Sequence, residues 1–171
     1  MKPNVESATK KKPTAAARNV SARGLAFIAS FEGCVLHPYD DGGPGRGNAT
    51  IGVGHLIHYG LVTAADMRRY AGFTRGQAMS LLRADAAHAV AAVDQLGLRF
   101  SQPEFDALCS FAFNCGGGSL AGGIARNLHA SNDQAAMNVL REYVHGPGGV
   151  VMAGLVRRRN AEANLFLHGT Y

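Results

Sequence analysis

The sequence contains no tryptophan, only three cysteines among its 171 residues, and no lysine after Lys12. It also lacks any run of about 18 consecutive apolar residues, which predicts that the chain makes no stable insertion into a membrane. The basic N-terminal segment is not followed by an apolar stretch of about 7–15 residues, so no secretory signal is expected. With 47% hydrophobic and 17% charged residues, the chain is apolar enough and long enough to form one globular domain.

The formal charge of +5 at pH 7 is concentrated near the N-terminus. Residues 1–23 contain six of the 17 basic residues and a single acid, whereas the rest of the chain contains 11 arginines and 11 acids. Residues 1–20 have few large apolar side chains, and we expect them to form a disordered basic arm. The run Lys10–Lys12 is either a solvated linker or a site of attraction to nucleic acid or an anionic envelope. The balanced remainder argues against a nucleic-acid-binding protein, and residues 21–171 are expected to be the folded domain.

Helix signals flank a segment rich in turns. Ser21 is predicted to cap a first helix that ends near Glu32. Between Cys34 and Tyr59, glycine-rich turns and β-favouring residues predict a small antiparallel sheet. The later apolar spacing is helical, so the sequence predicts an α+β fold. The later helices are expected to begin at Thr63, Thr74, Ser101, Ser131 and Ala153, and the one from Thr74 is expected to continue to Leu96.

Two acids lie beside the predicted sheet, Glu32 at the end of the first helix and Asp41 in the turn after Tyr39. Apolar neighbours are expected to solvate Glu32 poorly and to favour its protonated form, whereas Asp41 should stay hydrated and ionised. Two carboxyl groups in unlike environments that face one cleft are what glycoside hydrolysis requires. Asp40 adjoins Asp41 and competes for the same role.

The motifs around these acids resemble those of phage-type lysozymes (endolysins), glycoside hydrolase family 24. Glu32-Gly33, Tyr39-x-Asp41 and Thr50-Ile51-Gly52-Val53-Gly54-His55 occur in the family's order, and residues 105–114 and 154–162 resemble its later blocks. The resemblance covers about residues 22–168. It implies a lysozyme-like fold with a small N-terminal lobe that carries a short antiparallel sheet. A long connecting helix, a helical C-terminal lobe and a substrate cleft between the lobes are implied as well.

The activity that the resemblance implies is that of a muramidase. Such an enzyme cleaves the β-1,4 bond between N-acetylmuramic acid and N-acetylglucosamine in peptidoglycan, with no cofactor or metal. Glu32 would be the general acid, and Asp41 and Thr50 would handle the attacking water, since a threonine hydroxyl both donates and accepts hydrogen bonds. The implied substrate-binding residues are Tyr39, His55, Leu56, Phe113 and Asn114.

The chain departs from the family pattern in two places. The turn between Asp41 and Thr50 is longer than usual, which leaves open whether Asp40 or Asp41 faces the cleft. The tryptophan that often precedes a later Gly-Gly element is absent, and Tyr143 is expected to replace it as a platform for a sugar ring. His55 and His58 lack a third ligand, so we expect no zinc site and assign His55 a supporting hydrogen bond.

The cysteines and a run of arginines are interpreted as structural residues. Cys34, Cys109 and Cys115 match no zinc or redox motif and are expected to be reduced, although a bond from Cys34 to another cysteine stays open. The arginines at 157–159 are expected to form a solvated helix face, unless Arg157 pairs with Glu32 or attracts the anionic wall.

Other functions are compatible with the same motifs. A non-catalytic wall-binding module is one alternative, and a chitinase or a lytic transglycosylase is another. For a phage lysozyme without a signal sequence, we expect a monomer that stays in the host cytoplasm until lysis. A holin-type membrane pore would then give it access to the cell wall in the periplasm.

Overall fold

The computed structural model describes residues 18–171, which divide into two compact units. One unit comprises residues 19–88, and the other comprises Arg18 and residues 89–171. Residues 1–17 of the predicted basic arm lie outside the described residues. Its predicted end at residue 20 is wrong, because Val20 is only 3% exposed and its carbonyl accepts a hydrogen bond from Arg83 Nη1 at 3.2 Å. No helix within residues 18–171 is long and apolar enough to span a bilayer.

The unit of residues 19–88 begins with helix α1 (Ala22–Glu32). As predicted, Ser21 caps it, since Ser21 Oγ accepts a hydrogen bond from Gly24 N at 3.0 Å. The helix ends at Gly33, whose φ of 77° is in the left-handed region that glycine adopts without strain. Local chemistry therefore fixes both ends of the helix that carries Glu32.

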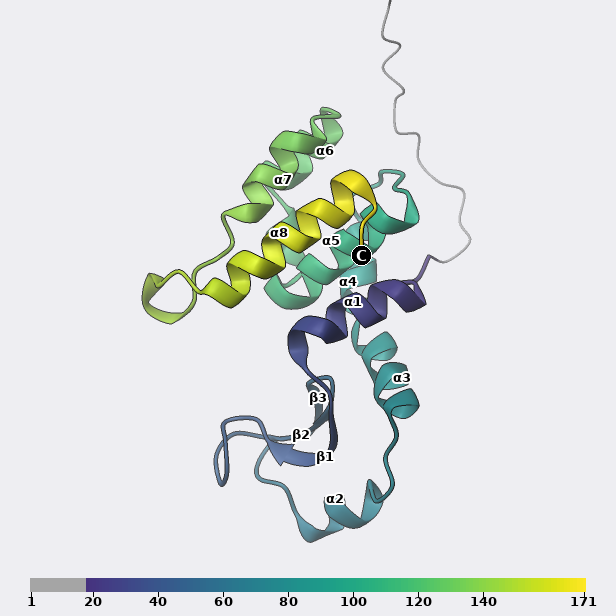
Figure 1. The fold of residues 1–171 in the computed structure, drawn as a ribbon, viewed down its shortest axis with the longest axis vertical. Helices are drawn as coiled ribbons and strands as arrows, with labels where there is room; N and C mark the ends of the chain where they lie inside the picture. The colour runs from purple at the N-terminus through teal and green to yellow at the C-terminus, as the bar shows by residue number, and fades with distance from the viewer. Residues whose placement is uncertain (1–17) are drawn as a thin grey trace, which may run out of the picture. The chain divides into compact units, whose positions relative to one another are not determined.

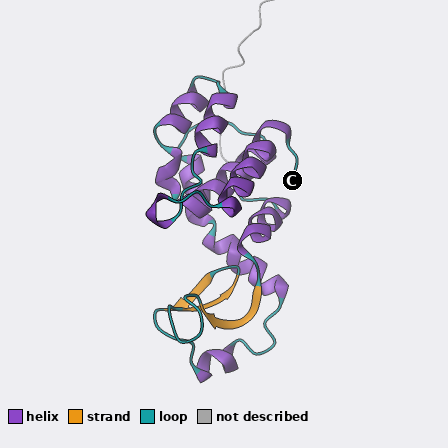
Figure 2. Ribbon diagram, turned by 60° about the vertical axis from the view of Figure 1, so that its left-hand side comes forward, coloured by secondary structure: helices purple, strands orange, loops and turns teal. Residues whose placement is uncertain are grey.

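A three-stranded antiparallel sheet follows, in the order β1-β2-β3 (Figures 1 and 2). Its strands are β1 (Val35–Asp40), β2 (Ala49–Gly52) and β3 (His55–His58). Tyr39 lies opposite Thr50, and Thr50 lies opposite Leu56. Since directly paired residues project to the same face of a sheet, three predicted site residues form one row across it.

Two helices with capping boxes complete this unit, α2 (Ala64–Arg69) and α3 (Arg75–Asp85). Thr63 and Thr74 are the N-caps, as predicted. α3 contacts β2, where a side chain at Gly52 would come within 3.3 Å of Ala78 Cβ. Gly52 also has a φ of 68°, so both the backbone and the close approach require glycine there.

The helix predicted to run unbroken from Thr74 to Leu96 is instead two helices, α3 and α4 (Ala87–Asp94). They are separated at Ala86, whose N–H is shared between the carbonyls of Leu82 and Ala84. Ala86, Ala89 and Val93 are all buried, so the apolar spacing continues through the break. For that reason the hydrophobic pattern carried no sign of it.

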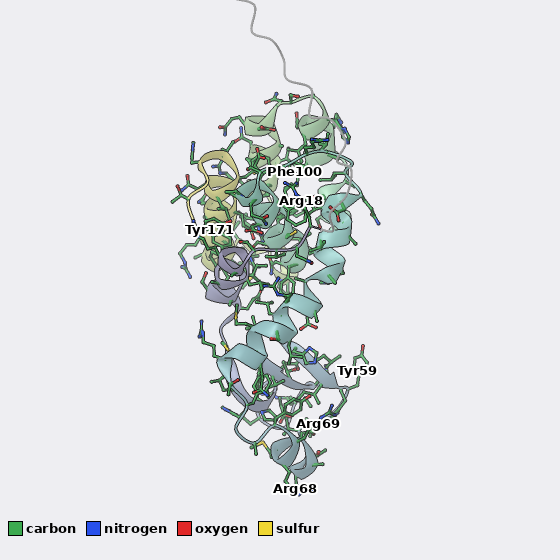
Figure 3. The ribbon with its side chains drawn as sticks, turned by 90° about the vertical axis from the view of Figure 1, so that its right-hand side faces the viewer. Arg18, Tyr59, Arg68, Arg69, Phe100 and Tyr171 are labelled. Carbon is green, nitrogen blue, oxygen red and sulfur yellow. The ribbon has the colours of Figure 1, made fainter. Side chains whose placement is uncertain are left out.

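The other unit is helical. α5 (Gln102–Cys115) begins at the predicted capping box of Ser101 and Glu104, is buried from Phe105 to Ala112, and contacts α8 (Ala153–His168). Arg18 belongs to this unit: it donates a hydrogen bond to the Phe100 carbonyl, and both residues are labelled in Figure 3. The remaining elements are η1 (Gly117–Leu120), α6 (Gly123–His129), α7 (Asp133–Arg141) and η2 (Pro147–Gly149).

Two details of this unit differ from the sequence expectations. No pattern in the sequence predicted α6, which follows Gly122 and has no side-chain cap. The cap of α7 is Asn132 and not Ser131, because Asn132 Oδ1 accepts a hydrogen bond from Ala135 N at 3.2 Å. Neighbouring Ser131 has a φ of 55°, which is outside the extended conformation typical of an N-cap.

His58 ties the end of β3 to the start of α2. Its Nδ1 lies 3.0 Å from the Tyr59 carbonyl oxygen and its Nε2 lies 2.9 Å from Asp66 Oδ2. Only the doubly protonated imidazolium can donate to both acceptors. The bond to the Tyr59 carbonyl and then the one to Asp66 raise the pKa of His58, while hydrogen bonds from Thr63 and then His58 lower the pKa of Asp66 to about 2.

Stability should therefore depend on pH through this pair. The contribution of His58 is complete below its ordinary pKa of 6.5 and is lost as the pH rises through its raised value. That of Asp66 is complete above 3.8 and is lost as the pH falls toward 2. We expect the melting temperature of the chain to exceed that of His58→Ala at pH 6, and the difference to shrink by pH 9. His37→Ala, at an exposed position, is the control; a difference that does not vary with pH would contradict the prediction.

Candidate functional site

In the unit of residues 19–88, the charges of two acids affect the pKa of the same phenol. Glu32 is the last residue of α1, Tyr39 lies on β1, and Asp41 follows the strand. Burial raises the pKa of Tyr39, and the negative charges of Asp41 and then Glu32 raise it further. The fold thus brings both predicted catalytic acids near one side chain, which keeps its proton and can act as a hydrogen-bond donor.

The solvation expected of Glu32 is wrong. Its side chain is exposed. Gly33 has no side chain to cover it, and the Phe31 ring packs edge-on against Phe27 with the ring centroids 5.2 Å apart. Asp41 is exposed, as the sequence predicted. In this structure both acids are accessible to a ligand.

Asp40 and Asp41 differ in their hydrogen bonds. Asp40 uses both carboxylate oxygens on backbone, Oδ1 accepting from Val62 N at 2.8 Å and Oδ2 from Gly45 N at 2.9 Å. Asp41 Oδ1 accepts from Asn48 N at 2.7 Å, and its Oδ2 has no hydrogen bond to the described residues. Asp40 therefore holds the long turn in place, whereas Asp41 keeps one oxygen available.

The long turn itself seats Asp41. Gly47 has a φ of 88°, and a Cβ at that position would collide with Asp41 Oδ1. The Asp41 backbone N–H also donates to the Asn48 carbonyl at 3.1 Å. The extra turn residues thus close on themselves around the carboxylate and do not displace it from the end of β1.

Thr50, the third predicted catalytic residue, is 3% exposed in the middle of the sheet. Its Oγ1 donates a hydrogen bond to the Asn48 carbonyl at 3.1 Å. With the proton committed to the backbone, the lone pairs of the hydroxyl oxygen remain as acceptors. Leu56, its neighbour in the row, is 40% exposed.

His55 makes the supporting hydrogen bond that the sequence predicted. Its Nδ1 lies 3.0 and 2.9 Å from the two carboxylate oxygens of Asp85, so it connects β3 to α3. His58 is engaged by Asp66, and the two histidines do not share a site. Within residues 18–171 there is no group of three or more His, Cys, Asp or Glu side chains that could hold a metal ion.

The other unit contains an open pocket of about 640 Å³. Asn114, at the exposed end of α5, lines it, whereas Phe113 is half-buried and does not. Tyr143 is 38% exposed, and its ring packs edge-on against Phe111 with the centroids 5.1 Å apart. Cys115, Ser119, Val139, Glu142, His145 and Leu155 complete the lining.

The solvated arginine face expected at 157–159 is wrong for two of its three members. Arg157 is exposed, but Arg158 is 3% and Arg159 0% exposed. Both pair with Glu162, which is fully buried and was not singled out from the sequence. The signal available was spacing: Glu162 lies three and four residues after the two arginines, on a helix that packs against α5.

The three cysteines are free thiols, so no bond involves Cys34. Cys109 is buried in α5, and burial raises the pKa of its thiol. Burial also raises the pKa of Cys115. Cys109 has the small, buried apolar role that the sequence predicted, whereas Cys34 and Cys115 are only partly buried.

The fold and the paired acids define an α+β lysozyme-like protein, and comparison with known proteins gives the family. The phage lysozyme family profile matches residues 29–162. The chain belongs to this family, which corresponds to glycoside hydrolase family 24. The resemblance and the fold class predicted from the sequence are thereby confirmed.

Endolysins from phages of several hosts are similar in sequence to this chain. The chain is 38% identical over 153 residues to an endolysin of Bacillus phage B103, covering 88% of this chain and 55% of the relative. It is 40% identical over 149 residues to an endolysin of Lactococcus phage c2, covering 86% and 59%. The chain therefore spans little more than half the length of these relatives. With an endolysin of Salmonella phage P22 the identity is 32%, over 86% of this chain and 97% of the relative.

Solved structures are similar over nearly their full length. An endolysin from Escherichia coli O157:H7 phage FAHEc1 has a TM-score of 0.76 and 29% identity, covering 94% of this chain and 98% of that one. A mutant of P22 lysozyme has a TM-score of 0.70 and 28% identity, covering 88% and 99%. The fold is thus shared over most of this chain and nearly all of the solved ones.

Proposed function

We propose that the chain is a muramidase that hydrolyses the β-1,4 bond between N-acetylmuramic acid and N-acetylglucosamine in peptidoglycan. The observation that carries this proposal is that the negative charges of Asp41 and then Glu32 add to burial in raising the pKa of the Tyr39 phenol. Family membership and the similarity to phage endolysins support it. Action at the bacterial cell wall, leading to host lysis, is the corresponding biological role.

In the proposed mechanism Glu32 is the general acid. It protonates the leaving glycosidic oxygen, while Asp41 Oδ2 accepts a proton from the attacking water. Thr50 Oγ1, whose proton is committed to the Asn48 carbonyl, accepts the water's other hydrogen bond. A bound glycan strand would exclude water from the exposed Glu32.

The neighbouring side chains are proposed to position the glycan. Tyr39 keeps its proton and donates a hydrogen bond, and Leu56 offers an exposed apolar contact in the same row of the sheet. His55 supports β3 through Asp85. In the other unit, Phe113, Asn114 and the exposed ring of Tyr143 are proposed to contact substrate.

Mass analysis of peptidoglycan digested by the protein tests this proposal. We expect fragments that end in reducing N-acetylmuramic acid, because water is the nucleophile in the proposed reaction. Fragments that end in 1,6-anhydromuramic acid would instead identify a lytic transglycosylase. No fragments at all, with retained binding to cell walls, would identify a non-catalytic wall-binding module. Protein inactivated by boiling is the control.

A further inference from the structure

We propose that Arg159 is a positioning residue that fixes the Asn114 amide so that its NH₂ group faces the pocket of the helical unit. The inference rests on the proposed function and deepens it: it identifies how a residue outside the pocket sets the kind of group that the pocket binds. Arg159 itself does not line the pocket.

Arg159 connects three segments from a fully buried position on α8. Its Nη1 donates to Glu162 Oε2, its Nε donates to the Tyr143 carbonyl at 3.1 Å, and its Nη2 donates to Asn114 Oδ1. The guanidinium carbon also lies 5.1 Å from the centroid of the Phe111 ring. Two of these partners, Asn114 and Tyr143, line the pocket.

The charges of the buried cluster explain why Arg159 takes Asn114 Oδ1 as a hydrogen-bond acceptor. Glu162 Oε1 accepts hydrogen bonds from Arg158 Nε at 3.0 Å and from Ser110 Oγ at 2.7 Å, so only Oε2 remains for Arg159. Two guanidinium groups thus share one carboxylate, and oxygen dipoles must stabilise the surplus positive charge. Asn114 Oδ1 is one of those oxygens.

This contact determines which end of the Asn114 amide faces the pocket. If the Asn114 amide turned over, its NH₂ group would face the guanidinium, and two donors would oppose each other. The carbonyl oxygen therefore stays on Arg159, and the NH₂ group is presented on the exposed side. A donor at this position matches an amide carbonyl oxygen, which peptidoglycan carries in its acetamido groups and in its stem peptides.

Three variants separate positioning from mere support of the fold. Asn114→Asp keeps a partner for Arg159 but presents an acceptor in place of the donor. Arg159→Lys retains the charge but lacks the planar fork that reaches Asn114 and Tyr143 together. Ser110→Ala, the matched control, removes a hydrogen bond from the same buried cluster without touching either pocket residue.

Binding is measured by calorimetry on a Glu32→Gln background, so that it does not depend on turnover, and KM and kcat are measured with Glu32 intact. The probes are chitotetraose, which carries only acetamido carbonyls, and a disaccharide tetrapeptide, which adds peptide carbonyls. We expect Kd and KM to rise about tenfold in Asn114→Asp and several-fold in Arg159→Lys, with kcat within about twofold. Ser110→Ala should lower the melting temperature and leave both constants unchanged.

The two probes also distinguish the source of the carbonyl. Weaker binding of both probes supports an acetamido group, and weaker binding of the disaccharide tetrapeptide alone supports a stem peptide. An unchanged Kd in Asn114→Asp would overturn the proposal, as would equal effects of Arg159→Lys and Ser110→Ala on Kd. A chain that binds the probes but does not cleave peptidoglycan would refute the proposed activity and leave this inference standing.

Discussion

Glu32→Gln is expected to abolish the lysis of bacterial cell walls while leaving the fold intact. Glutamine has nearly the same shape but cannot give a proton to the leaving oxygen, and a general acid contributes about 10²–10⁴-fold to a rate. Because Glu32 is exposed at the end of α1, the core does not depend on its charge. A turbidity assay on cell walls measures the loss, and far-UV circular dichroism confirms the fold. Clearing at the wild-type rate would exclude Glu32 as the acid.

The adjacent aspartates provide a matched pair for the same assay. Asp41→Asn should lower the rate at least tenfold with little change in melting temperature, because Asp41 has one oxygen without a partner among the described residues. Asp40→Asn should lower the melting temperature and spare much of the activity, because both of its oxygens accept backbone N–H groups. The reverse result would show that Asp40 is the catalytic carboxylate.

Glu162→Gln is expected to cause the largest loss of stability. The change removes the carboxylate that Arg158 and Arg159 share, and leaves their charges in an environment where all three residues are at most 3% exposed. Breaking a buried ion pair in this way costs about 3–5 kcal/mol of the free energy of unfolding. For a domain of this size, that corresponds to a fall in melting temperature of about 10 °C.

Differential scanning calorimetry measures this effect. Glu142→Gln is the control, since it makes the same chemical change at an exposed position and should shift the free energy of unfolding by less than about 0.5 kcal/mol. Equal melting temperatures for the two variants would show that the buried cluster contributes nothing to stability.

The N-termini of four helices could be predicted from the sequence, which also proposed the acids of the candidate site. Ser21, Thr63, Thr74 and Ser101 cap helices as predicted, because a cap depends on a side chain and backbone only two or three residues apart. Glu32, Asp41 and Thr50 were proposed because they stand in ordered motifs around a turn-rich strand region. These motifs also gave the family, which the comparisons confirm.

Features that depend on contacts distant in sequence were not predictable. The hydrogen bonds that distinguish Asp40 from Asp41 include one from the Val62 N–H, which lies 22 residues from Asp40 in the sequence. The break at Ala86 left no trace, because its neighbours on both sides are equally apolar.

The sequence by itself determined the fold class and the family and proposed the two acids, because caps, turns and motif order are local properties of the chain. The formal net charge of +5 does not describe the surface of the folded part, because the side chains of Arg158 and Arg159 are buried there. Only the tertiary structure decided that they surround Glu162 and that Arg159 reaches Asn114, 45 residues away. Burial makes those charges costly, so the chain must supply partners from several helices, and no local pattern reveals which ones.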